Sequence, residues 1–331
     1  MIAQTMTAIA VDGGKGPAEA LKTVQIDTPR AGAGQILIQV EAAGVNRPDL
    51  MQRQGVYPPP PGAPSTLGLE VAGRVARVGG GVGRWHEGDA VVALLGGGGY
   101  AQYAAVDARH VLPLPRGLDA IHGAALPETV FTVFANVFEA GKLAAGETFM
   151  VHGATSGIGV AAIQMAKAAG ARVIATGRGA DKAAAALRLG ADLAIDTTAQ
   201  DFVEAAKADG GVDVILDMVG GEFVARGLET LRPKGRLVMI AVQGGVKAQV
   251  NLLTILQKQL VLTGSTLRPR SADDKAKLAA AVEATVWPWV EAGALSPIID
   301  RVFPLSRAGE AHAWLETGGH VGKVVLSVGP E

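Results

Sequence analysis

The sequence predicts an α/β protein with a mostly β first domain and a second domain built on a doubly wound parallel sheet. Three observations predict this class. The 331 residues are enough to bury two cores. Short apolar runs and turns rich in Gly, Pro and Asp fill residues 1–126, whereas strand-like runs alternate with Ala-rich helical stretches from residue 148 onward. Where this second pattern begins, residues 151–159 indicate a strand, a turn of small residues and a helix start.

The first domain is predicted as a partly closed β barrel, with strands at residues 36–40 and 71–78. Two segments, residues 44–51 and 55–62, are predicted as loops with a functional role. Four consecutive prolines stiffen the second loop and can hold Tyr57 at a cleft at little entropic cost. A rigid surface loop and a ligand for a proline-binding module are the alternatives. Near the end of the chain we expect helices at residues 273–292 and 308–317 and strands at residues 298–303 and 324–328.

Residues 151–159 predict a nucleotide-binding turn. Small residues let the backbone turn sharply and let a pyrophosphate approach the helix N-terminus. The Gly-x-Gly-x-x-Gly fingerprint is altered, with Ala154 and Ser156 in the first two glycine places and Gly159 in the third, so a plain strand-to-helix turn stays an alternative. Strand-like runs give the turn its context, and they lie at residues 148–152, 172–176, 193–196, 212–217, 236–240 and 260–263. Six such strands predict a Rossmann domain.

Composition excludes several classes of protein. A net charge of -1 gives no electrostatic footprint for nucleic acid or an anionic membrane. The absence of cysteine excludes disulfides, thiolate catalysis and cysteine-bound zinc, and it is compatible with a reducing cytoplasm. No uncharged apolar run is long enough to span a membrane, and residues 1–20 do not have the pattern of a signal peptide. We therefore expect a soluble, cytoplasmic protein.

Several motifs resemble the medium-chain dehydrogenase/reductase superfamily. The first is Asn46-Arg47-Pro48-Asp49, which runs on to Gly55 and is followed by Tyr57 and its prolines. Further matches occur in the family's order at residues 67–73, 88–91, 98–103, 126–132, 264–268 and 322–326. Within the superfamily, the sequence is similar to the zinc-free NADPH:quinone oxidoreductases of the p53-inducible type and, more distantly, to zeta-crystallin.

The resemblance implies a Rossmann doubly wound parallel sheet inserted in a GroES-like, mostly β catalytic domain. The Rossmann domain would span residues 128–270, and the discontinuous catalytic domain would span residues 1–127 and 271–331. The active site would lie in the cleft between the two domains.

The sequence departs from the zinc alcohol dehydrogenases of the same superfamily. Those enzymes have a metal-binding cysteine near the position of Asn46 and Gly-His-Glu where this chain has Gly68-Leu69-Glu70. The six histidines, at positions 86, 110, 122, 152, 312 and 320, do not have the spacing of metal ligands. We expect no metal site, and no oxidation of a zinc-bound alkoxide.

NADPH is the predicted cofactor. An NAD site usually ends its second strand with an Asp or Glu, but Gly177 offers no carboxylate there. Arg178 and Lys182 follow and can bind a 2'-phosphate, although two solvated cations at a helix start are an alternative. The turn and the carboxyl ends of the fourth and fifth strands supply the other candidates, namely Ser156, Gly157, Ile158, Val219, Ala241, Gly244 and Gly245. The family resemblance adds Asn46, Thr132, Thr197, Leu267, Arg268 and Lys323, the last with a structural role in its strand as an alternative.

The candidate catalytic residues are Asn46, Tyr57 and Thr132. Tyr57 can donate a hydrogen bond to a substrate carbonyl oxygen, the Asn46 amide can orient the nicotinamide or the acceptor, and the resemblance puts Thr132 near the nicotinamide. Reduction of a quinone needs little more than geometry, because the cofactor supplies the hydride and water can supply protons. The predicted function is therefore NADPH-dependent quinone reduction.

Two other functions stay open. One is zinc-free reduction of 2-alkenals or enoyl thioesters, and the other is NADPH binding with a structural or RNA-binding role. The expected partner is a small-molecule quinone, since the sequence has no basic stripe for nucleic acid and no membrane span. By analogy with the family we also expect a homodimer joined at the Rossmann sheet edges, with a tetramer as the alternative.

Overall fold

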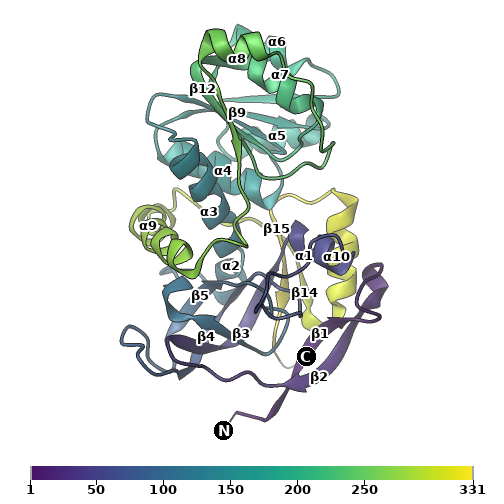
Figure 1. Ribbon diagram of the computed structural model, residues 1–331, viewed down its shortest axis with the longest axis vertical. Helices are drawn as coiled ribbons and strands as arrows, with labels where there is room; N and C mark the ends of the chain where they lie inside the picture. The colour runs from purple at the N-terminus through teal and green to yellow at the C-terminus, as the bar shows by residue number, and fades with distance from the viewer. Residues whose placement is uncertain (1, 330–331) are drawn as a thin grey trace. The chain divides into compact units, whose positions relative to one another are not determined.

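The computed structural model describes residues 2–329 (Figure 1). They form two compact units. We call the first the β unit; it comprises the chain up to Phe131, Arg268–Trp287 and the chain from Pro297 onward. We call the second the Rossmann unit; it comprises Thr132–Leu267 and Pro288–Ser296.

The β unit is organised by a seven-stranded sheet of order β14-β15-β3-β4-β5-β7, with β6 paired to β3. Its strands are β3 (Gln35–Val45), β4 (Glu70–Val78), β5 (Ala90–Leu94), β6 (Tyr103–Asp107), β7 (Val111–Pro113), β14 (Ile299–Pro304) and β15 (Lys323–Ser327). A separate antiparallel pair is formed by β1 (Thr5–Val11) and β2 (Leu21–Asp27). Apolar side chains such as Ile36, Ile38 and Val71 point from these strands into one core.

The end of the chain returns to the first sheet. Strand β15 pairs antiparallel with β3, with Val324 opposite Val45. The helices predicted here are confirmed within one residue, as α9 (Ala272–Glu291) and α10 (Ala308–Thr317). The β unit is therefore discontinuous in sequence, and its last strand adjoins the strand that ends beside Asn46.

One of the predicted loops is wrong. Residues 44–51 form the end of β3 and then the helix α1 (Arg47–Arg53). Asn46 caps this helix, Pro48 lies in its first turn, and the side chain of Asp49 accepts a hydrogen bond from the Asn46 amide at 2.9 Å. This half of a capping box, together with a proline pre-set for helix geometry, is a local signal for a helix start. The second predicted loop, residues 55–62, has no helix or strand.

The Rossmann unit contains the six predicted strands in one parallel sheet of order β10-β9-β8-β11-β12-β13. The strands are β8 (Thr148–His152), β9 (Arg172–Gly177), β10 (Leu193–Asp196), β11 (Val212–Asp217), β12 (Leu231–Met239) and β13 (Val261–Gly264). Five helices pack on this sheet: α4 (Gly157–Ala168), α5 (Ala180–Arg188), α6 (Phe202–Ala208), α7 (Glu222–Thr230) and α8 (Leu252–Lys258). The order reverses between β8 and β11, and nucleotides bind at such a switch point in open α/β sheets.

Short helices complete the chain. They are α2 (Ala120–Gly123), α3 (Pro127–Val133), a π-helix (Phe134–Ala140) and the 3-10 turns Ala18–Ala20, Ala108–His110 and Leu305–Arg307. Within residues 2–329, every helix lacks the combined length and apolarity that crossing a membrane requires.

Candidate active site

A buried cluster surrounds Asn46 at the end of β3. The Lys323 ammonium group donates to Asn46 Oδ1 at 2.5 Å, to Glu70 Oε1 at 2.7 Å and to the Val45 carbonyl at 3.2 Å. The side-chain nitrogen of Asn46, Nδ2, donates to the same Glu70 oxygen at 2.8 Å. The side chains of Glu70 and Lys323 are only 0% and 6% exposed, so their charges compensate each other inside the β unit. The structure therefore brings together two predicted site residues, Asn46 and Lys323, around a carboxylate that the sequence analysis had not selected.

The backbone makes room for this cluster. A Cβ atom at Gly44 would lie 2.1 Å from Glu70 Oε1, so only glycine lets the carboxylate approach β3 this closely. The second carboxylate oxygen accepts a hydrogen bond from the Glu128 amide at 2.9 Å. A sequence signal for Glu70 was present, because a charge within the apolar run of residues 67–73 needs a buried partner.

The cluster does not fit a catalytic zinc ion. The Asn46 oxygen already accepts a hydrogen bond from an ammonium group, and the neighbouring Leu69 has no ligand atom. Within residues 2–329, no group of three or more His, Cys, Asp and Glu side chains is arranged to hold a metal ion. We therefore assign no chemical step to a metal.

Tyr57 and Arg268 form a second polar group in the β unit. The guanidinium carbon lies 5.6 Å from the centre of the Tyr57 ring, which is a cation–π distance. Arg268 is fixed from the other side by the Gly96 carbonyl at 2.7 Å and by Gln52 Oε1 at 2.8 Å. Burial raises the pKa of Tyr57, with Arg268 acting in the opposite direction, so the hydroxyl keeps its proton near neutral pH. The protonated hydroxyl can donate a hydrogen bond to a bound molecule.

In the Rossmann unit, the turn after β8 has the geometry of a phosphate-binding turn. Gly153 has a φ of 79°, and Ser156 caps α4 by accepting a hydrogen bond from the Gly159 amide at 2.9 Å. A Cβ atom at Gly159 would lie 2.3 Å from the Gly153 carbonyl oxygen, which explains the glycine at the third place of the fingerprint. Gly157 and Ile158 follow the cap in the first turn of α4, where amide groups attract anions. These residues fit the pyrophosphate of a dinucleotide.

The end of β9 adjoins the predicted 2'-phosphate site. The Thr197 amide and hydroxyl donate to the Gly177 carbonyl at 2.9 and 3.2 Å, so these two predicted residues are in contact. A Cβ atom at Gly177 would lie 3.0 Å from the Lys182 Cβ atom, which places Lys182 beside this strand end. Arg178 is exposed and makes no ion pair with any residue from 2 to 329. The carboxylate of Asp196 accepts from the Gly179 amide at 2.8 Å.

The loops after β11 and β12 are joined to each other. The Gly244 amide donates to the Val219 carbonyl at 2.6 Å, and the Gly221 amide donates to the Gly245 carbonyl at 3.0 Å. Asp217, which the sequence analysis had not selected, accepts hydrogen bonds from the Val219 and Gly220 amides at 2.7 and 3.2 Å, and burial raises its pKa. Ala241 lies two residues beyond the end of β12. The structure thus brings Val219, Gly244 and Gly245 together at the carboxyl edge of the sheet.

The predicted site residues are divided between the two units. Asn46, Tyr57, Arg268 and Lys323 belong to the β unit. Thr132 and Leu267 belong to the Rossmann unit, where the Thr132 carbonyl accepts a hydrogen bond from Asn136 at 2.8 Å. That these residues act in one site stays a prediction.

The chain is similar to known proteins over almost its whole length. Residues 32–116 match the family described as alcohol dehydrogenase GroES-like domain, and residues 189–326 match the family described as zinc-binding dehydrogenase. The quinone oxidoreductase of Rattus norvegicus is 31% identical over 326 residues, which cover 97% of this chain and 97% of that protein. The chain belongs to the quinone oxidoreductase family.

Two solved structures have the same fold as this quinone oxidoreductase family member. The Escherichia coli quinone oxidoreductase complexed with NADPH has a TM-score of 0.84 and 29% identity, with 98% of this chain and 99% of that chain covered. An NAD-dependent alcohol dehydrogenase has a TM-score of 0.85 and 29% identity, with 98% and 100% covered. The predicted fold class is confirmed, since a GroES-like domain is combined with a parallel Rossmann-type sheet. This family member is an oxidoreductase of the medium-chain dehydrogenase/reductase superfamily.

Proposed function

We propose that this oxidoreductase reduces quinones by hydride transfer from NADPH, without zinc. The observation that carries the proposal is the buried cluster of Asn46, Glu70 and Lys323. In it the Asn46 oxygen and both Glu70 oxygens already accept hydrogen bonds from protein groups, which leaves no open position for a metal ligand set. A reaction that draws its reducing power from a cofactor and its protons from water suits such a site.

Bound NADPH would supply the hydride. On the Rossmann unit, Ser156, Gly157 and Ile158 would hold the pyrophosphate, and Val219 and Gly244 would border the nicotinamide side. Arg178 would meet the 2'-phosphate with its forked donors, supported by Lys182. In support of NADPH over NADH, β9 ends in Gly177 and the nearby Asp196 carboxylate accepts from the Gly179 and Thr198 amides at 2.8 and 2.9 Å.

On the β unit, Tyr57 would donate its hydroxyl to a substrate carbonyl oxygen as negative charge develops there. The guanidinium group of Arg268 beside the ring makes this position electropositive and favours that charge. The Asn46 side chain has a fixed orientation, because it bonds to Lys323 on one side and to Glu70 on the other. We therefore assign Asn46 the role of orienting the nicotinamide or the acceptor, and no proton transfer.

The first experiment compares NADPH and NADH oxidation by the pure protein with an ortho-quinone, a para-quinone and a 2-alkenal. We expect fast oxidation of NADPH by a quinone, and little oxidation with NADH or with the alkenal. Turnover confined to the alkenal would move the function to reduction of activated double bonds. Tight NADPH binding without any turnover would contradict the proposed activity altogether.

A matched pair of variants tests the cofactor preference. Arg178→Ala removes charge-assisted hydrogen bonds worth about 1.5–3 kcal/mol, so the KM for NADPH should rise on the order of tenfold or more while the KM for NADH stays unchanged. Arg188→Ala, an exposed arginine at the end of α5, is the control and should leave both values unchanged. An equal rise for the two cofactors would contradict a role for Arg178 at the 2'-phosphate.

We also propose that the protein forms a homodimer through the free edge of the Rossmann sheet. Strand β13 is the last in the sheet order, and unpaired edge strands of this kind pair readily with another chain. Val261 of β13 is 47% exposed, and α8, which contacts the neighbouring strand β12, has Leu252 and Leu256 67% and 73% exposed. A patch of this kind marks an interaction surface on a protein.

A further inference from the structure

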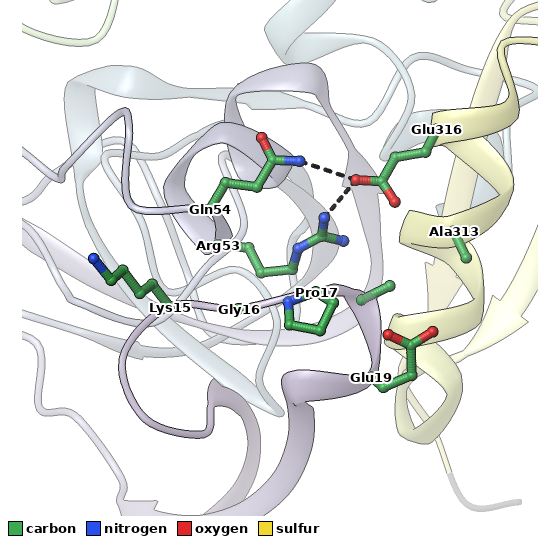
Figure 2. Close-up of a pocket in the computed structure, with 9 residues that line it drawn as sticks. Lys15, Gly16, Pro17, Glu19, Arg53, Gln54, Ala313 and Glu316 are labelled. Atoms are coloured by element: carbon green, nitrogen blue, oxygen red, sulfur yellow. Dashed lines mark hydrogen bonds and ion pairs between the residues drawn. The ribbon is translucent and has the colours of Figure 1, made fainter.

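A surface hollow of the β unit leads to an ion pair in which only the arginine is buried. Figure 2 shows Arg53 in the wall of this hollow, near Lys15, Pro17 and Glu19. Its guanidinium group pairs with Glu316, whose carboxylate also accepts a hydrogen bond from Gln54 at 3.0 Å. The Arg53 side chain is only 2% exposed, so this cation faces the interior as well as the hollow.

From Arg53, polar contacts continue inward to the helix cap at Asn46. Arg53 Nη1 lies 3.5 Å from His312 Nδ1, and His312 Nε2 lies 3.0 Å from the Tyr100 hydroxyl. The Asp49 carboxylate is the next polar group: after burial, its charge and its hydrogen bond with the hydroxyl raise the pKa of Tyr100. His312, Tyr100 and Asp49 are all 0% exposed. The Asp49 carboxylate also accepts from the Asn46 amide at 2.9 Å and from the Gly68 amide at 3.0 Å.

Chemistry fixes the direction of every hydrogen bond in this chain. A guanidinium group has donors only, so His312 Nδ1 must accept from Arg53 and Nε2 must carry the proton. That proton is donated to the Tyr100 oxygen, and the tyrosine proton is then directed at Asp49. Burial, with Arg53 beside the ring, lowers the pKa of His312 to about 3, so the imidazole stays neutral as this arrangement requires. The chain is polarised from a cation at the hollow to a carboxylate at the cap.

We propose that the chain Arg53–His312–Tyr100–Asp49 is a positioning device, which keeps Asp49 ionised on the Asn46 backbone and thereby holds Asn46 on Glu70 and Lys323 during turnover. The inference rests on the proposed function, in which the orientation of Asn46 matters to the reaction. None of the four residues touches substrate or cofactor in this scheme. Each acts through the next, and the last acts through the backbone of Asn46.

The surroundings of Asp49 make its ionisation sensitive to this chain. Burial raises its pKa to about 6, against the lowering effect of the Asn46 and Gly68 amides. The charged and titratable groups that face Asp49 are Lys323, Glu70, Tyr100 and Arg268. Loss of the tyrosine hydroxyl removes a donor to the carboxylate and should therefore raise the pKa of Asp49 further.

The test compares Tyr100→Phe with Tyr103→Phe. The first substitution removes the hydroxyl in the middle of the four-residue chain of polar contacts. The second makes the same change at a partly buried tyrosine of β6 that is not one of these four residues. The first readout is independent of activity. The amide proton shifts of Asn46 and Gly68, followed by NMR against pH, should titrate together near pH 6 in the wild type. In Tyr100→Phe the midpoint should rise by about one pH unit, and in Tyr103→Phe it should stay in place.

The second readout is the pH profile of kcat. With a midpoint raised by one unit, Tyr100→Phe should lose about fivefold in kcat at pH 6 and about twofold at pH 7, and should recover wild-type kcat at pH 8.5. His312→Gln, which can accept from Arg53 and donate to Tyr100, should retain most of the wild-type profile.

The outcomes separate this inference from the proposed function. Wild-type turnover with a quinone decides the function, whereas the NMR titration tests the chain whether or not a quinone is the substrate. Wild-type amides of Asn46 and Gly68 that do not titrate together, or a midpoint unmoved by Tyr100→Phe, would overturn the chain. If Tyr100→Phe shifts the NMR midpoint but lowers kcat equally at every pH, or does not lower it, the positioning role would be overturned.

Discussion

His152 offers a quantitative test of how burial controls ionisation in the Rossmann unit. The residue ends β8, directly before the turn that leads into α4, and it is 0% exposed. Its Nδ1 atom lies 2.9 Å from the Thr176 hydroxyl. Its ring packs edge-to-face against Phe202 and Phe223, with 5.1 and 5.0 Å between the ring centres. Burial, with a smaller effect of Arg226, lowers the pKa of His152 from 6.5 to about 3. The folded protein therefore holds this imidazole neutral.

The pKa shift of His152 sets the sign and size of a pH effect on stability. Because the pKa of His152 is lower in the folded protein than in the unfolded chain, its contribution to the free energy of unfolding is fully present above the unfolded pKa of 6.5. This contribution is lost as the pH falls from 6.5 to about 3. Between pH 7.5 and pH 5 the unfolded chain takes up the proton and the folded protein does not. The free energy of unfolding should fall by about 2 kcal/mol on this account.

Urea denaturation of the wild type and of His152→Asn at both pH values measures this effect. Asparagine can still bond Thr176 but does not titrate, so the advantage of the wild type over the variant should shrink by about 2 kcal/mol at pH 5. Other groups, including Asp49, whose raised pKa acts in the opposite direction, cancel in the comparison. A difference between the two proteins that is the same at pH 7.5 and pH 5 would refute the reasoning.

Three further substitutions test other parts of the structure. Lys323→Met leaves Glu70 buried without its cation and should lower the free energy of unfolding by about 3–5 kcal/mol in a denaturation experiment, and a loss below about 1 kcal/mol would count against the ion pair. Gly159→Ala forces the turn after β8 open, so calorimetry should give a Kd for NADPH raised at least about tenfold, whereas Gly83→Ala at an open position should leave it unchanged. Leu256→Glu should halve the mass measured by sedimentation. The control Leu187→Glu, at another exposed leucine of the Rossmann unit, should leave the mass unchanged. A stable dimer in both variants would exclude the β13 edge as the dimer interface.

Local patterns in the sequence predicted most of the Rossmann unit. Each strand is a short apolar run bounded by turns, and strands β10 and β11 have the predicted bounds without change. The turn of small residues before α4 was predicted because a sharp strand-to-helix turn depends on residues only a few positions apart. Such features are written in short segments, and a single sequence is enough to find them.

The polar clusters of the β unit could not be found in this way. Glu70 and Lys323 are 253 positions apart, and Tyr100 and His312 are 212 apart, so no periodicity or spacing links them. Only the pairing of β15 with β3 brings Lys323 to Asn46. The helix α1 is a different case, because its capping signal at Asn46 and Asp49 is local and was overlooked in favour of a loop.

Because Lys323 lies near the C-terminus, its position also affects the order in which the two units can finish folding during synthesis. The chain emerges from the ribosome N-terminus first, so β3 and β4 exist long before β15 is made. Until then the Glu70 carboxylate has no cation, and the core around it cannot close without burying an unpaired charge. Nearly the whole Rossmann unit, Thr132–Leu267, is complete in the meantime. The domain that begins the chain is therefore the last to be finished.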